Sequence, residues 1–181
     1  IAGMTAAGGR RTAELDLVQV RLPEVPAEIP QLHFADAMAR LGKDDVDLAP
    51  ADERALSAWA QQEYGSEFLF VTGYPMAKRP FYTHPEPGRP RYSNSFDLIF
   101  RGLELITGGQ RLHRHQDYLD ALAARGEPIE PYAGYLATFA GGMPPHGGFA
   151  LGLERFVARL TGADNIRLTT LFPRDLHRLA P

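Results

Sequence analysis

The segment from residue 144 to residue 162, PPHGGFALGLERFVARLTG, has the composition of a strand-to-helix junction that could bind an anion. Glycines at 147, 148 and 152 would let backbone amides approach a ligand without an intervening Cβ atom. A helix beginning near Gly152 would direct its positive end at the same place, with Arg155 in its first turn. A guanidinium there could bind a phosphate or stack on an aromatic base. The pattern is compatible with a nucleotide site and equally with a tight strand-to-helix packing turn that carries a surface arginine, because short glycine motifs are common.

A second segment, residues 95–113 (SFDLIFRGLELITGGQRLH), could supply ligands for a metal ion and for a carboxylate. It is typical of two short strands around Arg101-Gly102. Glu104 and Thr107 offer hard oxygen ligands suited to Mg²⁺, an ion that keeps several waters and bridges phosphates. Arg111 follows two glycines, so its fork could bind a carboxylate bidentately. The alternative is a hairpin whose polar residues face solvent.

Strand alternation predicts which side chains in this segment share a face. In the first strand, Asp97 and Ile99 should face away from the apolar set Phe96, Leu98 and Phe100. In the second strand, Glu104 and Ile106 should share a face opposite Leu103 and Leu105. Asp97 therefore lies near the candidate site by sequence, without an assigned role.

Other chemistries have little support. The histidines at 113, 115 and 146 lack coherent zinc-ligand spacing, and the absence of cysteine excludes disulfides and cysteine-ligated zinc. No G-x-S-x-G elbow marks a serine hydrolase. We therefore expect neither a zinc site nor a Ser-His-Asp triad.

Composition indicates an ordinary globular chain of 181 residues, with 44% hydrophobic and 23% charged residues. A formal net charge of −3 gives no global basic field, so nucleic acid would need a local patch. No apolar run approaches the roughly 18 residues that span a bilayer. The opening IAGMTAAGGRR lacks both an initial methionine and a secretory signal, so we expect a piece of a longer protein. The lack of cysteine makes a reducing compartment the default.

Hydrophobic periodicity and Gly/Pro punctuation predict the elements that position these residues. Residues 14–31 should be extended because three prolines oppose a helix, and residues 84–94 should form a loop. The expected strands include 68–71 and 148–151. The expected helices are those over 34–41, from Pro50 to Gly65, through Tyr118 to Gly126, through Tyr135 to Phe139, and over 152–160. Strands joined by hairpins and long excursions favour an α+β fold with an antiparallel sheet.

Three stretches in order carry a joint resemblance: FDLIFRGLELITGGQRLH, GGMPPHGGFALGLERFVARLTG and NIRLTTLFPRD. Together they resemble the back half of a class II aspartyl-tRNA synthetase catalytic domain, nearest the archaeal, non-discriminating type. The resemblance covers about residues 14–181. It implies that residues 1–181 form the C-terminal portion of the catalytic domain, as part of the class II antiparallel sheet flanked by helices. Motif 3 is included, whereas motif 1, motif 2 and the OB-fold anticodon-binding domain are absent.

The resemblance also implies roles for matching positions. Glu104 resembles the carboxylate that contacts ATP and Mg²⁺, and Thr107 takes the place of a serine whose hydroxyl helps to hold Mg²⁺ and the amino acid. Arg111 resembles the arginine that grips the side-chain carboxylate of aspartate. Gly152, Leu153, Glu154 and Arg155 resemble the ATP-binding segment, and Arg155 together with Glu104 would be catalytic.

The implied activity is ATP-dependent formation of aspartyl-adenylate and transfer to tRNA-Asp, with tRNA-Asn as a further candidate acceptor. Such an enzyme would use Mg²⁺ and would be cytoplasmic, with no membrane association. It would form a homodimer through regions outside this segment. Because an isolated half-sheet would expose open edges, we expect this segment alone to be inactive. The alternatives are an asparaginyl-tRNA synthetase or asparagine-forming relative, a non-catalytic synthetase-derived module, and an unrelated α+β domain.

Overall fold

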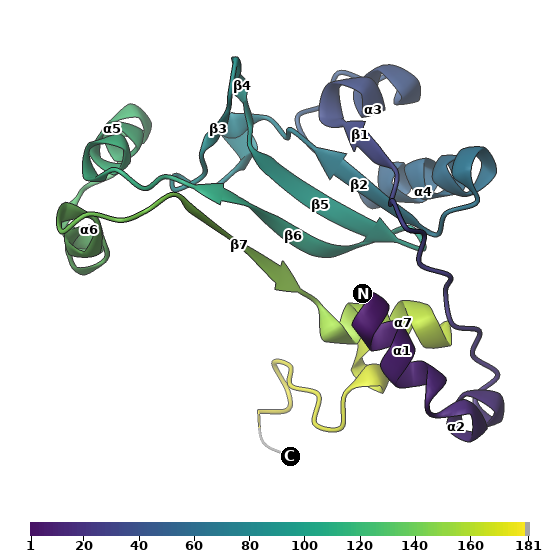
Figure 1. The fold of residues 1–181 in the computed structure, drawn as a ribbon. Helices are drawn as coiled ribbons and strands as arrows, with labels where there is room; N and C mark the ends of the chain where they lie inside the picture. The colour runs from purple at the N-terminus through teal and green to yellow at the C-terminus, as the bar shows by residue number, and fades with distance from the viewer. Residues whose placement is uncertain (180–181) are drawn as a thin grey trace.

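The computed structural model describes residues 1–179, and its elements are shown in Figure 1. The α-helices are α1 (Ala2–Gly9), α2 (Thr12–Leu17), α3 (Phe34–Leu41), α4 (Pro50–Tyr64), α5 (His115–Arg125), α6 (Ala133–Ala140) and α7 (Leu153–Thr161). The strands are β1 (Gln31–His33), β2 (Phe68–Thr72), β3 (Pro85–Glu86), β4 (Arg89–Ser93), β5 (Ser95–Phe100), β6 (Leu103–Arg111) and β7 (His146–Leu151). Short 3₁₀ turns cover Met76–Lys78, Glu130–Tyr132 and Ile166–Thr169.

One five-stranded sheet organises the chain, with the strand order β1-β2-β5-β6-β7. Only β1 and β2 pair in parallel; β2, β5, β6 and β7 pair antiparallel. Helices α5 and α6 lie beyond one end of the sheet, and α7 follows β7 at the other (Figure 1). The predicted α+β class with an antiparallel sheet is therefore confirmed.

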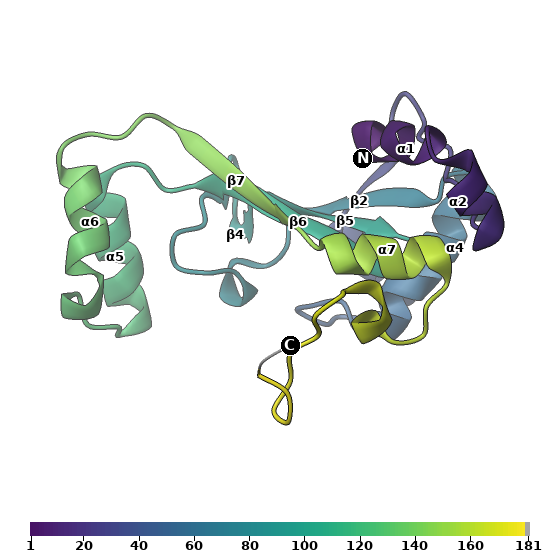
Figure 2. The same ribbon diagram turned by 90° about the horizontal axis from the view of Figure 1, so that it is seen from below.

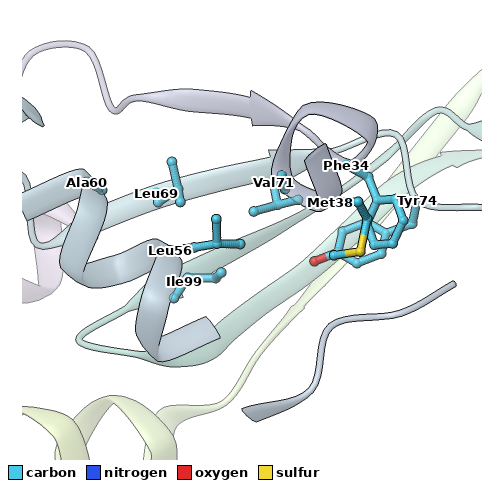
Figure 3. Close-up of a cluster of buried hydrophobic side chains, with 9 residues drawn as sticks. Phe34, Met38, Leu56, Ala60, Leu69, Val71, Tyr74 and Ile99 are labelled. Carbon is cyan, nitrogen blue, oxygen red and sulfur yellow. The ribbon is translucent and has the colours of Figure 1, made fainter. Parts of the chain in front are cut away.

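Two apolar clusters lie on opposite faces of the sheet. On one face, α3 and α4 pack against β2 and β5, and Figure 3 shows Leu56 and Ala60 of α4 beside Leu69, Val71 and Ile99. The other face buries a set of strand residues with Phe156 of α7, namely Phe68, Leu98, Phe100, Leu105 and Ile106. Figure 2 shows α1 and α4 on opposite sides of the sheet.

The helix boundaries follow the sequence signals. Helix α4 begins at Pro50, where the missing N–H costs no hydrogen bond, and its C-cap Gly65 has a φ of 64°. Helix α3 is likewise capped by Gly42 and helix α5 by Gly126, and both glycines have the left-handed backbone conformation. These ends were predicted and are confirmed. Strand β7 begins two residues earlier than expected, at His146.

Two predictions along the chain were wrong. Residues 12–17 form α2 rather than extended chain, because the first proline of that stretch, Pro23, lies six residues beyond the end of this helix and cannot oppose it. Residues 84–94 contain the β3–β4 hairpin rather than only a loop, with Gly88 at a φ of 77° in its turn. The prolines at 85 and 90 are tolerated because this two-stranded ribbon consists of edge strands.

Among residues 1–179, no helix combines the length and the apolar character needed to cross a bilayer.

Asp52, buried in the first turn of α4, gives a prediction about acid sensitivity. Its carboxylate accepts hydrogen bonds from Lys43 Nζ at 2.7 Å and from the Ala49 amide at 3.0 Å. The hydrogen bond from Lys43 is the main reason that the Asp52 pKa lies below its ordinary value. We expect Asp52→Asn to lower the free energy of unfolding by about 1–2 kcal/mol at pH 7.

The sign of the pH dependence follows from the lowered pKa. The folded state favours ionised Asp52, so this contribution is complete above the unfolded-state pKa and fades as pH falls through the folded-state pKa. Urea unfolding of both forms at pH 7 and near pH 3 should therefore show a difference that shrinks in acid. An equal difference at both pH values would contradict it.

Candidate active site

A β-bulge in β6 determines which side chains meet at the site. Leu98 of β5 opposes Ile106, and the next residue, Ile99, opposes Glu104, so Leu105 has no partner. The prediction that Glu104 and Ile106 share a face is therefore wrong, because the extra residue reverses the alternation. Glu104 lies on the Ile99 face, as does Thr107, which pairs with Asp97.

Arg155, in the first turn of α7, pairs with Glu104. Its Nη1 donates to the Glu104 backbone oxygen at 2.9 Å and to Oε1 at 3.3 Å. The two side chains are 43% and 34% exposed, so a ligand could reach both. A Cβ atom at Gly152 would lie 3.1 Å from Cδ of Arg155, so a side chain at position 152 would press on the aliphatic part of Arg155. The structure thus joins two residues 51 positions apart that the sequence assigned to one site.

Negative charge accumulates around Glu104. Burial, followed by the charge of Asp97, raises the pKa of Glu104, while Arg155 opposes the rise. Burial also raises the pKa of Glu53, whose Oε2 accepts the Glu104 amide at 2.9 Å. The charges of Asp97 and Glu53 both raise the pKa of Glu104, so a cation beside Glu104 would stabilise its ionised form.

Arg79 was missed by the sequence analysis and occupies the centre of the site. Its Nη2 donates to both oxygens of Asp97 at 3.1 Å, and its Nη1 donates to Thr107 Oγ1 at 3.4 Å. Its guanidinium lies over the Tyr74 ring, 4.0 Å from the centroid. The only sequence signal was an arginine preceding a proline in KRPFY, at the end of a 3₁₀ turn.

A cavity of about 310 Å³ extends from Thr107 along β6 to Arg111. Arg79, Tyr82 and the glycines at 108, 109 and 148 also line it. Arg111 lies over the Tyr82 ring at 5.1 Å, and a Cβ at Gly148 would approach its Nη2 to 3.3 Å. Within residues 1–179, the Arg111 guanidinium has no hydrogen bond or ion pair. A half-buried guanidinium facing a small cavity is suited to bind a carboxylate.

The remaining predicted residues lie outside this cavity. Gly152 caps α7 and contacts Arg155, while the side chains of Leu153 and Glu154 are exposed. A larger apolar hollow of about 1250 Å³ lies on the opposite face, between residues 25–31 and the sheet. It contains none of the predicted site residues, so we place the site at the charged face.

The residues present fit a loosely held divalent cation better than a closed metal centre. In the described part of the chain, no three His, Asp or Glu side chains are grouped as a metal-binding set. Mg²⁺ often uses only one or two protein carboxylates together with substrate phosphates and water. Glu104, partly exposed among other acids, meets that requirement, and Thr107 lies on the same face.

Residues 4–176 match the family described as tRNA synthetases class II (D, K and N). The chain is 46% identical over 174 residues to an aspartate–tRNA(Asp/Asn) ligase of Thermus thermophilus, covering 93% of this chain and 40% of that protein. It is 37% identical over 157 residues to the cytoplasmic aspartate–tRNA ligase of Bos taurus, covering 83% of this chain and 31% of that protein.

A solved structure gives the same fold. An asparaginyl-tRNA synthetase of Entamoeba histolytica, in complex with asparaginyl-adenylate, superposes with a TM-score of 0.79 at 29% identity. The match covers 100% of this chain and 42% of that chain. The chain therefore spans about two fifths of the length of that structure and of the Thermus relative.

Proposed function

Since the chain belongs to the family of class II tRNA synthetases (D, K and N), we propose that the protein containing it is an aspartate–tRNA ligase. It would activate L-aspartate with ATP and transfer the aspartyl group to tRNA-Asp, with tRNA-Asn as a second acceptor to be tested. We further propose that residues 1–181 correspond to the C-terminal portion of the catalytic domain.

The assignment of aspartate as the amino acid rests on the guanidinium of Arg111, which is unpaired within residues 1–179. Its guanidinium lacks a partner within the described residues and lines a cavity of about 310 Å³ with Thr107 and Arg79. A bidentate contact to the side-chain carboxylate of aspartate would complete its hydrogen bonding. Asparagine would instead present an amide nitrogen to one donor of the fork, which disfavours it.

In the first step, an α-carboxylate oxygen of aspartate attacks the α-phosphorus of ATP. The P–O bond to the β-phosphate breaks, and pyrophosphate leaves. In the second step, a 3′-terminal ribose hydroxyl of tRNA attacks the acyl carbon, loses its proton and releases AMP. Neither step needs a covalent enzyme nucleophile, so catalysis depends on positioning and charge stabilisation.

We assign the residues to this chemistry as follows. Arg155 would contact phosphate, next to the Gly152–Leu153–Glu154 segment at the start of α7. Glu104 and Thr107 would hold Mg²⁺, which when bound neutralises phosphate charge. Arg111 would bind the aspartate side chain, and Arg79 would keep Asp97 and Thr107 in place through the contacts described above.

Aspartate-dependent exchange of pyrophosphate into ATP tests the proposal, with asparagine assayed beside aspartate. We expect exchange with aspartate and, because of Arg111, at least about 100-fold lower kcat/KM with asparagine. Preference for asparagine would favour the alternative enzyme, an asparaginyl-tRNA synthetase or asparagine-forming relative, which the structural match keeps open. A protein that neither binds ATP nor supports exchange would instead be a non-catalytic synthetase-derived module.

The remaining parts of the proposal concern partners and location. We propose a homodimer formed through regions outside this segment, with no membrane association, and a cytoplasmic location like that named for the Bos taurus relative. Charging assays with separate tRNA-Asp and tRNA-Asn transcripts would decide the acceptor range.

A further inference from the structure

The turn between β5 and β6 contains an arginine in an unfavourable backbone conformation. Arg101 and Gly102 have φ values of 46° and 76°, and the flanking residues Phe100 and Leu103 pair directly. Two positive φ values in a two-residue hairpin define a type I′ turn, which favours Asn-Gly or Asp-Gly. A long side chain at the first position is strained there. Turn geometry alone therefore does not explain Arg101.

The Arg101 side chain uses all three guanidinium nitrogens to join separate parts of the fold. Its Nε donates to Glu67 Oε1 at 2.7 Å, and its Nη2 donates to the Arg21 backbone oxygen at 3.2 Å. Its Nη1 donates to the backbone oxygen of Arg159 at 3.1 Å and reaches that of Leu160 at 3.5 Å. The side chain is 23% exposed, so these contacts are largely shielded from water.

The two carbonyls reached by Nη1 belong to the last turn of α7. The last four carbonyls of an α-helix lack partners within the helix, and a cation is favoured at that end. Arg101 thus caps α7 from the sheet. In Figure 1, α7 follows the end of β7 and continues toward the end of the sheet where β5 turns into β6.

Arg101 and Arg155 therefore act at opposite ends of α7. Arg155 in the first turn bonds to Glu104, and Arg101 bonds to the Arg159 carbonyl in the last turn, about 6 Å further along at 1.5 Å per residue. The turn is itself fixed by α4, since Ser57 Oγ accepts the Gly102 amide at 3.0 Å. The first turn of α7 is therefore attached to the start of β6, and its last turn is attached to the β5–β6 turn that precedes that strand.

We propose that Arg101 is a positioning residue that fixes the orientation of α7 and, through it, the direction of the Arg155 guanidinium. Arg101 does not touch substrate. The effect of Arg101 on ATP binding rests on the proposed function, whereas its effect on the position of α7 does not.

The test uses Arg101→Asn in the full-length protein. Asparagine suits a type I′ turn better than arginine, so a residue serving only the turn would tolerate the change. We expect instead about a 10-fold rise in KM for ATP in pyrophosphate exchange, because small misplacements of a catalytic group are costly. The KM for aspartate should stay within about twofold, since Arg111 is the last residue of β6, at the end of the strand away from the turn. Arg101→Lys should fall between wild type and Arg101→Asn, because one ammonium cannot replace a three-way fork.

Arg21→Gln is the matched control, because Arg21 Nη2 bonds to the same Glu67 oxygen at 3.3 Å from an exposed position. It should leave both KM values unchanged. Hydrogen exchange in α7 provides a readout independent of catalysis: amides near residues 159–163 should exchange faster in Arg101→Asn than in Arg21→Gln.

The outcomes separate the two proposals. Wild-type KM for ATP and unaltered α7 exchange in Arg101→Asn would overturn the positioning role. A lower kcat and melting temperature with both KM values unchanged would also overturn it, as a purely structural effect. If the wild-type protein shows no aspartate-dependent exchange, the proposed function fails, and α7 hydrogen exchange alone decides the role of Arg101.

Discussion

Replacing Arg155 with alanine is expected to lower aspartate-dependent ATP–pyrophosphate exchange by about 10²–10³-fold, the usual cost of losing one preorganised charge-stabilising donor. The geometry makes the site intolerant of this change. Nη1 alone bonds to Glu104, so the rest of the guanidinium is available to phosphate. Arg155→Lys should recover only part of the rate, because a single ammonium cannot serve both Glu104 and phosphate. Steady-state exchange at saturating aspartate measures the effect.

The control for Arg155→Ala is Arg167→Ala, which removes an exposed arginine paired at 3.3 Å with Asp175. It should retain wild-type activity. If Arg155→Ala stays within threefold of wild type while folded, the assignment of Arg155 to ATP is wrong.

The same variant should alter the pH profile. Arg155 opposes the rise in the Glu104 pKa caused by burial and by Asp97, so removing Arg155 should raise that pKa further. As the pH falls, Glu104 would then become protonated at a higher pH than in the wild type. The acid limb of the pH profile of kcat/KM should therefore move to higher pH in Arg155→Ala. An unmoved acid limb would show that Glu104 ionisation does not limit activity.

The predictable parts of the fold were those in which local signals agree with packing. Helices α4 and α5 were foreseen because proline or glycine marks their ends and their apolar residues follow one helical face. The glycines before α7 also indicated a strand-to-helix junction correctly. In these segments, backbone preference and burial favour the same structure.

The bulge at Leu105 could not be predicted from alternation. It depends on how β6 pairs with β5, a contact between strands that no local pattern records. Yet the bulge decides that Glu104 and Thr107, three residues apart, share the site face. Regular alternation would have placed them on opposite faces. Both residues were therefore predicted from the sequence, whereas their common orientation depends on the pairing of β6 with β5.

Arg79 and Glu53 were missed for a related reason. Each looks like an ordinary charged residue in its own segment, Arg79 before a proline and Glu53 in the first turn of a helix. Their importance lies in partners far along the chain: Asp97 for Arg79 and the Glu104 amide for Glu53. Buried polar side chains need such partners, but the sequence does not show which residues supply them.

Replacing Arg111 with glutamine is expected to reduce kcat/KM for aspartate by about 10²–10⁴-fold, while the KM for ATP changes only a few fold. Of the two arginines that line the cavity in the described part of the chain, Arg111 is the one without an ion pair, so the site would lose the fork that can pair with the substrate carboxylate, and an amide is a weak substitute. Arg111→Lys should remain strongly impaired, since lysine is a point charge without bidentate geometry. Pyrophosphate exchange over a range of aspartate and ATP concentrations separates the two constants.

Arg114→Gln is the matched control, three residues away, 74% exposed and paired with Asp117 at 2.7 Å. Because Arg114 does not line the cavity, this change should leave aspartate activation unchanged. Discrimination against asparagine should also collapse in Arg111→Gln, since the fork that rejects the amide is gone. If Arg111→Gln retained both its rate and its preference for aspartate, recognition would have to depend on another cation at the same cavity. Arg79 would be that candidate, although its bonds to Asp97 and Thr107 already occupy two of its three nitrogens.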